Sequence, residues 1–472
     1  MLRRDISRLL IIALFVTSAL SSGAAQPNAR GRTKPNVILI LMDDLGYGDI
    51  GSYGVNDART PNLDRLAREG VRFTDAYANG PNCSPTRAGL ISGQYQQRYG
   101  IEWPLGAVAD DTARGLPATG ATLPALLKKN GYATGLIGKW HLGFKQEFGP
   151  NAHGFDEFFG FLSGAVGYYS HKRGDGTSDL YENTKPVEVP GYLTDEITRR
   201  AVRFVESHST DPFFLEVAYN AVHWPFEVPD LPATSHHDVP QPSAPPSDLS
   251  LYQGPTVGLP ATRRDYVRML ERADEGVGQI LAMLERRGLT SNTMVIFTND
   301  NGGEWLSRNA PLRDRKSTLW EGGLRVPLII RWPGQLPANK TSPQVAITMD
   351  LTASILAATN TSIPANHKLD GINLLPSLSG ASPIVDRELF WRIKRPRDQR
   401  AVRSGRWKLV QDRNDFYLFD LSDDPGERHD LTSLHPEVVR KLNAALDQWE
   451  KSLASQNRGA VAKSNLAPAI HP

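Results

Sequence analysis

The chain has 472 residues, of which 22% are charged, 40% hydrophobic and 8% aromatic, and these proportions are ordinary for a globular protein. They exclude a mainly disordered chain, and the single cysteine excludes a disulfide framework within the chain. Setting aside residues 1–25, which hold three arginines and one aspartate, leaves 50 basic and 50 acidic residues. A neutral chain gives no support to nucleic-acid binding.

The first 25 residues have the pattern of a secretory signal peptide. Three early arginines precede an apolar run over residues 9–20, and Gly23-Ala24-Ala25 matches a small-residue cleavage site. The run is shorter than the roughly 20 residues that span a bilayer, so we expect no stable membrane insertion after signal removal; an uncleaved anchor is the alternative. Export without disulfides favours the bacterial periplasm or the extracellular space.

Short apolar runs alternate with helical patterns from Pro35 to about Thr361. This alternation predicts an α/β fold with a large, mostly parallel central sheet flanked by helices. The clearest run, residues 37–42, is apolar throughout, as in a strand buried on both faces. Further strands are expected at residues 71–76, 133–137, 213–218, 294–297 and 328–332. A helix is expected over residues 265–287, with Gly288 as its C-cap, and a proline-rich surface excursion over 226–262.

A different pattern begins near residue 385. Strand-like stretches at residues 387–393, 401–410 and 416–421 are separated by turn residues, and an amphipathic helix covers 436–453. This pattern predicts a small C-terminal antiparallel sheet with a packed helix. We therefore expect a signal peptide (1–25), a large domain (34–384), a small α+β subdomain (385–455) and a loose tail (456–472).

Chemically active side chains follow five of the expected strands. In chain order of the strands, they are Asp43 and Asp44; Cys83 and Arg87; Lys139 and His141; His223; and Asp300 and Asn301. Ligands of open α/β sheets bind beyond the carboxyl ends of the strands. These residues are therefore candidates for one shared site.

Each of these pieces also has a structural interpretation. Asp and Asn runs are common in turns, a histidine between strands can be structural, and a lone cysteine is often a buried small hydrophobe. Two acidic strand ends together suit a hard cation with oxygen ligands, Ca²⁺ or Mg²⁺. One cysteine and a few separated histidines do not suit structural zinc.

Residues 83–93 read C-S-P-T-R-A-G-L-I-S-G, which resembles the signature of the type I sulfatases: C-x-P-x-R with Leu and Gly at fixed offsets. Four further blocks occur in order: D-D-L-G-Y-G-D at 43–49, G-K-W-H-L-G at 138–143, T-N-D-N-G-G at 298–303, and 316–327 with W-E-G-G. The Y-L-F-D-L stretch at 417–421 resembles the family's small domain, so the resemblance covers nearly all of 34–453. One departure is Ala-Val before His223, where many members have proline.

The resemblance implies a sulfuric ester hydrolase of the arylsulfatase type on the alkaline phosphatase superfold. Cys83 would be oxidised by a maturation enzyme to Cα-formylglycine. In the hydrated aldehyde, one oxygen attacks sulfur and the second hydroxyl then drives the expulsion of sulfate. A serine would instead leave a stable sulfate ester.

The resemblance also implies a Ca²⁺ site and the roles of the remaining residues. The expected ligands are Asp43, Asp44, Asp300 and Asn301, with the modified Cys83.

Arg87, one helical turn after Cys83, would favour the ionised nucleophile. Lys139 and Lys316 would hold sulfate oxygens as point charges. His141 is the candidate base for eliminating sulfate. His223, alone or with Lys316, is the candidate acid for the leaving alcohol.

Aromatic residues near these blocks favour a sulfated carbohydrate substrate, with activity on aryl sulfates. Trp103, Trp224 and Trp305 could stack on sugars, although aromatic residues of this kind often belong to the core. Two other functions are alternatives: a phosphoric- or phosphonate-ester hydrolase on the same superfold, and a non-catalytic protein that binds sulfated glycans. The intact block at Cys83 favours sulfate hydrolysis over both.

Overall fold

The structure is a computed structural model that describes residues 34–106, 113–230, 261–394 and 397–456. The predicted signal peptide, nearly all of the predicted tail and most of the expected proline-rich excursion lie outside the described residues. In the described part of the chain, no helix is long and apolar enough to cross a bilayer.

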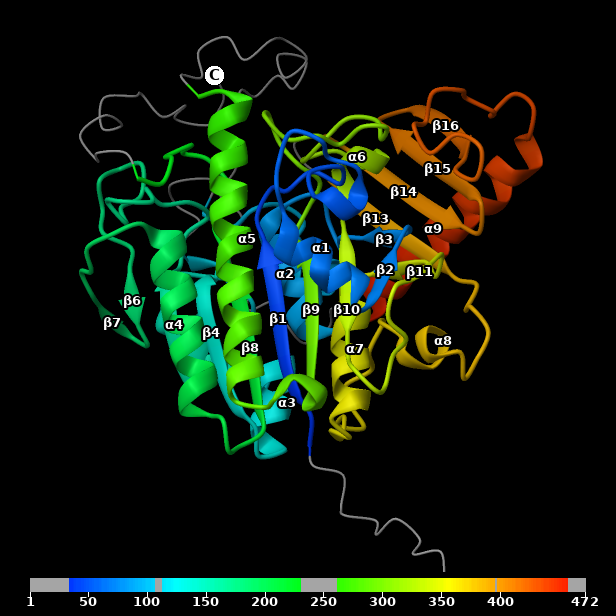
Figure 1. The fold of residues 1–472 in the computed structure, drawn as a ribbon. Coiled ribbons are helices and arrows are strands. Elements are labelled where there is room, and N and C mark those ends of the chain that lie inside the picture. Colours follow the sequence, from blue (N-terminus) through cyan, green and yellow to red (C-terminus); the bar gives the residue numbers. More distant parts are fainter. Residues whose placement is uncertain (1–33, 107–112, 231–260, 395–396, 457–472) are drawn as a thin grey trace, which may run out of the picture. The chain divides into compact units, whose positions relative to one another are not determined.

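A ten-stranded sheet forms the centre of the large domain, in the order β11-β2-β10-β9-β1-β8-β4-β5-β6-β7 (Figure 1). Five neighbouring strands run parallel: β9 (Thr293–Asn299), β1 (Asn36–Met42), β8 (Phe213–Ala218), β4 (Ala133–Lys139) and β5 (Glu157–Phe161). All residues of β1 are buried between its two neighbours, which explains its continuous apolar sequence. The predicted mostly parallel sheet is confirmed.

The two edges of the sheet contain antiparallel pairs. On one side, β10 (Leu328–Arg331) is antiparallel to both β9 and β2 (Val71–Phe73), and β11 (Lys340–Ser342) continues parallel to β2. On the other side, β6 (Tyr181–Glu182) and β7 (Lys185–Pro186) form a hairpin beside β5.

The single strand expected over residues 71–76 is wrong. β2 ends at Phe73, and β3 (Ala76–Tyr77) pairs with β12 (Ala346–Ile347) in a separate two-stranded sheet. Thr74 and Asp75 lie between the two strands, and the Thr74 hydroxyl donates a hydrogen bond to Asp75 Oδ2 at 2.6 Å. Hydrophobic patterning could not detect the break because the residues on both sides of it are buried.

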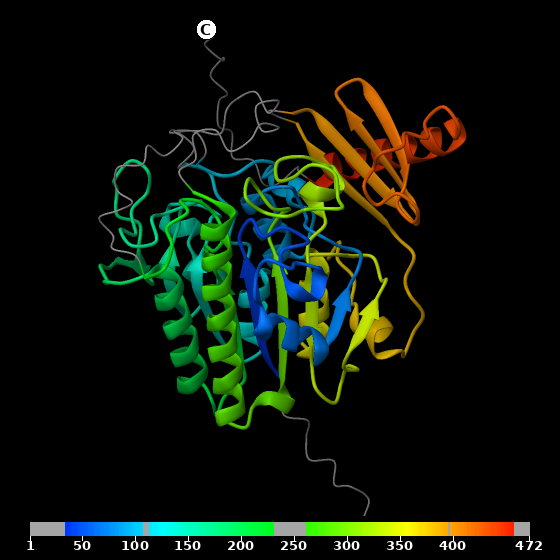
Figure 2. The ribbon, with the colours of Figure 1, turned by 45° about the horizontal axis from the view of Figure 1, so that its top comes forward.

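Helices cover both faces of the central sheet (Figures 1 and 2). Ile38, Ile40 and Met42 share a core with α1 (Pro61–Arg68), α4 (Leu193–Ser207) and α5 (Arg263–Arg286). Val37, Leu39 and Leu41 point to the opposite core, which includes α2 (Cys83–Ser92), α3 (Leu123–Lys129), α7 (Met349–Ala358) and α8 (Leu375–Ser379). The helix expected over 265–287 is confirmed as α5, which starts with a capping box at Thr262.

The predicted C-terminal sheet is confirmed. It has four antiparallel strands in sequential order: β13 (Glu388–Ile393), β14 (Gln399–Ser404), β15 (Trp407–Asp412) and β16 (Asp415–Asp420). The stretch expected over 401–410 is two strands with a turn at Gly405, whose φ of +56° favours glycine. Leucines of α9 (Pro436–Gln456) pack in a third core, which also contains Tyr77 and Trp320 of the large domain.

Candidate active site

The predicted site residues meet beyond the carboxyl ends of neighbouring parallel strands. Asp43 follows β1, Asp300 follows β9, and His223 lies in the segment after β8. Lys139 is the last residue of β4 rather than a loop residue. Gly138 before it has a φ of +122°, and a Cβ there would lie 1.9 Å from the Ala218 carbonyl oxygen, so only glycine fits.

Cys83 is the first residue of α2 and is buried. Its Sγ lies 3.6 Å from Asp43 Oδ1. Burial raises the pKa of the Cys83 thiol well above its usual range, and the nearby Lys139 and Lys316 offset only part of this effect. Because the thiolate is the reactive form of cysteine, the unmodified side chain is a poor nucleophile here.

Three buried aspartates each pair with a different cation. The pairs are Asp43 with Lys139 (Oδ2 to Nζ, 2.5 Å), Asp44 with Lys316 (Oδ2 to Nζ, 2.7 Å) and Asp300 with Arg87, whose Nε and Nη2 donate to Oδ2 at 3.1 and 2.8 Å. The positive charges expected to hold sulfate therefore lie directly beside the expected metal ligands.

Burial and the local charges together shift the pKa values of Asp300 and Asp44 in opposite directions. Burial, with the neighbouring Asp43, raises the pKa of Asp300 to about 6 although Arg87 opposes the shift. Burial also acts on Asp44, but Lys316 and His223 outweigh it and hold the pKa of Asp44 well below its usual range. An additional positive charge in this cluster would favour the ionised form of Asp300.

The residues present fit a hard cation. Ligand atoms of Asp43, Asp44, Cys83 and His223 all lie within 4.8 Å of one another. Asn301 donates from Nδ2 to Asp44 Oδ1 at 2.7 Å, while its own Oδ1 is buried with no hydrogen-bond partner among the described residues. An unsatisfied amide oxygen beside carboxylates is the type of ligand that Ca²⁺ takes.

The two histidines have different hydrogen-bond partners. His141 Nε2 lies 2.9 Å from the Leu105 carbonyl oxygen, so this nitrogen donates, and the buried Nδ1 has no partner in the described structure. His223 Nδ1 lies 2.6 Å from the Trp224 carbonyl oxygen, and its Nε2 lies 3.5 Å from Asp44 Oδ2. In neutral rings, His141 Nδ1 and His223 Nε2 are therefore the nitrogens with a lone pair.

Burial lowers the pKa of both histidines. For His223, burial and the Lys316 charge lower the pKa to about 3, with Asp44 opposing the shift. For His141, burial and Lys139 hold the pKa well below its usual value. The pKa of Lys316, in contrast, is raised well above its usual value, because Asp44 and Glu304 outweigh the effect of burial.

Two residues of the site have no assigned role in the sequence analysis. Glu304 Oε2 lies 3.2 Å from Lys316 Nζ, so Lys316 lies between two carboxylates. The Asn299 side chain makes two hydrogen bonds to the backbone of Leu45, the residue after Asp44. Leu45 N donates to Asn299 Oδ1 at 3.2 Å, and Asn299 Nδ2 donates to the Leu45 carbonyl oxygen at 2.8 Å. The position of Asn299 at the end of a strand could have identified it as a candidate site residue. The sequence gives no such signal for Glu304, which is a single glutamate in a loop.

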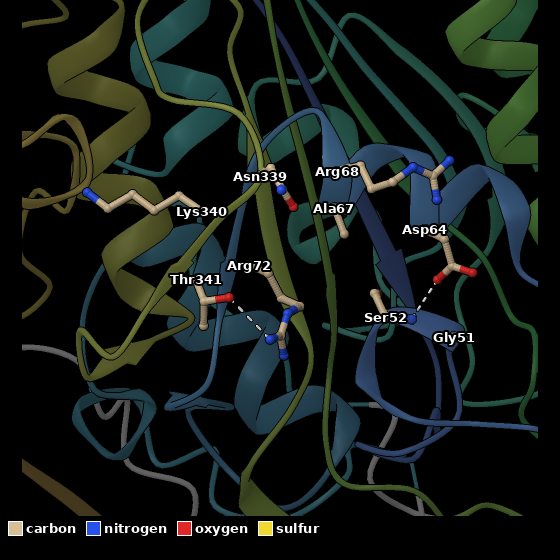
Figure 3. Close-up of a pocket in the computed structure, with 9 residues that line it drawn as sticks. All are labelled: Gly51, Ser52, Asp64, Ala67, Arg68, Arg72, Asn339, Lys340 and Thr341. Atoms are coloured by element: carbon tan, nitrogen blue, oxygen red, sulfur yellow. Dashed lines mark hydrogen bonds between the residues drawn. The ribbon is translucent and has the colours of Figure 1, made fainter.

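A separate hollow of about 310 Å³ lies between η1 (Gly51–Tyr53), α1, β2 and β11 (Figure 3). It shares no residue with the predicted site. Its cations do not converge, because Lys340 points away from Arg72 and donates to the Leu378 carbonyl at 3.1 Å. Arg72 donates instead to Thr341 Oγ1 at 3.2 Å.

Comparisons with known proteins identify relatives along nearly the whole chain. Residues 35–361 match the family model described as Sulfatase, and residues 313–452 match N-sulphoglucosamine sulphohydrolase, C-terminal. The chain is 31% identical to N-acetylgalactosamine-6-sulfatase of Rattus norvegicus, over 94% of this chain and 90% of the relative. It is 32% identical to arylsulfatase A of Bos taurus, over 92% of this chain and 90% of the relative.

A solved structure, Ps i-CgsB in complex with k-i-k-neocarrahexaose, is similar along nearly the whole chain. The TM-score is 0.78 at 30% identity, and the alignment covers 91% of this chain and 94% of that one. An alignment over 91% of this chain includes most of both the large domain and the C-terminal sheet. The chain belongs to the type I sulfatase family and is a sulfatase.

Proposed function

We propose that this sulfatase hydrolyses sulfate esters of carbohydrates, using one Ca²⁺ and a formylglycine made from Cys83. The observation that carries the proposal is the juxtaposition of Cys83 Sγ, three buried aspartates and two buried lysines. The carbohydrate substrate is supported by the name of the rat relative and by the hexaose complex of the structural neighbour. The signal-like start of the chain supports export to the periplasm or outside the cell.

The proposed Ca²⁺ ligands are Asp43, Asp44, Asp300, Asn301 and the modified Cys83, whose thiol marks where the aldehyde hydrate would stand. A hard cation there supplies positive charge that favours an ionised nucleophile and balances the sulfate. Formylglycine supplies a nucleophile whose second hydroxyl allows sulfate to leave by elimination.

The charged side chains position the sulfate group. The Lys139 and Lys316 ammonium groups bind sulfate oxygens, and their burial strengthens this interaction because water screens it little. Arg87 orients Asp300 through two hydrogen bonds and also donates to the Lys139 carbonyl at 2.9 Å. These contacts tie the nucleophile helix to two strand ends.

The proton transfers are assigned from the hydrogen bonds of the two histidines. His141 Nδ1 carries a lone pair and has no hydrogen-bond partner among the described residues, so it accepts the proton that is lost when sulfate leaves. His223 Nε2 and Lys316 Nζ both face Asp44 Oδ2. Lys316 keeps its protons, whereas the neutral His223 ring must first take up a proton at Nε2, so we assign the donation to the leaving alcohol to His223 with Lys316 as the source of the proton.

Protein produced together with a formylglycine-generating enzyme tests the proposal. Mass spectrometry of the peptide that contains Cys83 should show CH₂–SH replaced by CHO. Kinetics with N-acetylgalactosamine 6-sulfate, a sulfated neocarrahexaose, nitrophenyl sulfate and nitrophenyl phosphate should show turnover of the sulfate esters and a clear preference over phosphate. Preference for the phosphate ester would favour the alternative hydrolase.

Variants of Cys83 provide the matched controls. Cys83→Ala should abolish turnover and keep the wild-type melting temperature, because the role of the residue is chemical. Cys83→Ser should accumulate a sulfated serine, since no second hydroxyl can drive elimination. Full activity in Cys83→Ala would refute the mechanism.

A further inference from the structure

Trp224 and Trp305 differ from the seven other tryptophans of the chain. Each of those seven belongs to a hydrophobic core or packs against one, whereas Trp224 and Trp305 are in none of the three cores of the described residues. Both side chains are half-buried. Their ring centroids lie 5.9 Å apart, with the planes inclined by 40°. Core packing therefore does not explain these two large aromatic side chains.

Both tryptophans come from segments that carry active-site residues. Trp224 directly follows His223, and the centroids of their rings lie 4.9 Å apart. Trp305 directly follows Glu304, which is paired with Lys316. The tryptophan pair thus links the segment after β8 to the segment after β9, on the side of the site where the leaving alcohol is expected.

The chemistry of a sugar sulfate places its ring at this position. The ester oxygen is joined to the ring directly or through one exocyclic carbon, so the ring lies within a few bonds of the group that protonates that oxygen. Trp224 borders that group. The faces of a pyranose ring carry C–H groups, and the amphipathic rings of tryptophan suit such a ligand at low conformational cost.

We propose that Trp224 and Trp305 form the subsite for the sugar ring that bears the sulfate. This inference rests on the proposed function, because it assumes a carbohydrate substrate. Phe226, whose ring centroid lies 6.4 Å from that of Trp305, extends the aromatic surface towards the core.

Steady-state kinetics of matched variants test the subsite. The variants are Trp224→Ala, Trp305→Ala, Trp305→Phe and, as a control, Trp407→Ala, a half-buried tryptophan of the C-terminal sheet. The substrate is whichever of N-acetylgalactosamine 6-sulfate and sulfated neocarrahexaose the wild type turns over faster. We expect each alanine variant to raise KM by about tenfold or more, with a smaller change in kcat. Trp305→Phe should recover most of the loss, and Trp407→Ala should match the wild type.

Binding without turnover provides a second readout. In a Cys83→Ala background, the same sugar sulfate should change the intrinsic tryptophan fluorescence, and Trp224→Phe with Trp305→Phe should remove that change. Wild-type KM values in folded alanine variants, or an unaltered fluorescence response, would overturn the subsite and leave the proposed function standing. Turnover of nitrophenyl sulfate but of neither sugar sulfate would contradict the carbohydrate function, and the subsite with it.

Discussion

Asp44 contacts three other residues of the predicted site through its carboxylate: Lys316, His223 and Asn301. It adopts a φ of +63°, a conformation that L-residues seldom take, and is the second residue after the fully buried strand β1. This turn presents one oxygen to Lys316 and His223, and the other to Asn301. Backbone strain at this position is consistent with a functional requirement, because strained residues persist where surrounding contacts hold them.

Asn301→Ala tests the metal site more specifically than Asp300→Ala does. The substitution removes the unsatisfied Oδ1 without changing the charge, and we expect weaker Ca²⁺ binding and lower activity, partly restored by added Ca²⁺. Calcium titration and elemental analysis measure the effect. Asp300→Ala should be more severe, because it also leaves Arg87 buried without its carboxylate. Activity that survives exhaustive chelation, with no divalent ion found, would show that these ligands are misassigned.

Removal of His223 separates the two halves of the reaction. A sugar alkoxide is a strong base and needs a proton to leave, whereas a nitrophenolate scarcely does. General acid–base catalysis typically contributes about 10²–10⁴-fold, so His223→Ala should lose about that much on sugar sulfates and much less on nitrophenyl sulfate. Equal losses on both substrates in steady-state kinetics would exclude His223 as the acid.

His141→Ala should stall after the first half of the reaction. If His141 Nδ1 takes up the proton during elimination, the variant should accumulate the sulfated enzyme with either class of substrate. Intact-mass measurement after a substrate pulse detects this adduct at residue 83. A variant that is slow but shows no adduct would assign His141 to binding or positioning instead.

At the scale of elements, the C-terminal sheet holds the segment that carries Lys316. Leu319 N donates to Gln399 Oε1 of β14 at 3.1 Å. Lys408 of β15 is fully buried and pairs with both Glu321 and Glu427, each at 2.8 Å. Burying two carboxylates is costly, and a cation between them offsets this cost because it compensates their negative charge.

Lys408→Met should therefore destabilise the protein by about 3–5 kcal/mol, the usual cost of leaving a buried charge without its partner. Burial, with Glu321, already raises the pKa of Glu427 to about 7 against the effect of Lys408, so loss of the lysine would favour protonation further. Chemical denaturation measures the change. Lys451→Met on the exposed face of α9 is the control and should differ little from the wild type. Equal stability of the two variants would contradict the predicted role of the cluster.

At the scale of the whole molecule, the third core couples the small sheet to the catalytic part. Tyr77 and Leu324 of the large domain pack in the same core as Leu409 and Leu446 of the C-terminal part. A chain that ends at residue 384 would expose this surface to water, and we expect it to be insoluble or inactive. A chain that ends at Gln456 keeps every described contact and should stay active. Soluble yield and activity assays distinguish the two, and an active chain ending at 384 would show that the third core is dispensable.

The sequence alone predicted the fold class and the residues that meet at the ends of the central strands, but not the order of those strands in the sheet. These could be predicted because parallel strands place their carboxyl ends at one edge, so Asp43 and Asp300 were expected together although they are distant in the chain. The roles expected for Cys83 and Arg87 came from the resemblance of residues 83–93 to the sulfatase signature, and helix geometry adds only that the two residues lie one turn apart.

Only the tertiary structure decided features that depend on partners far away in the sequence. The break between β2 and β3, the antiparallel direction of β10 and the hairpin beside β5 follow from strand pairing, which apolar runs do not encode. The contact of Glu304 with Lys316, the separation of Trp224 and Trp305 from the cores, and the burial of Lys408 between two glutamates arise in the same way. A side chain's environment is set by the elements that pack around it, and local pattern predicts burial but not which distant residues supply the contacts.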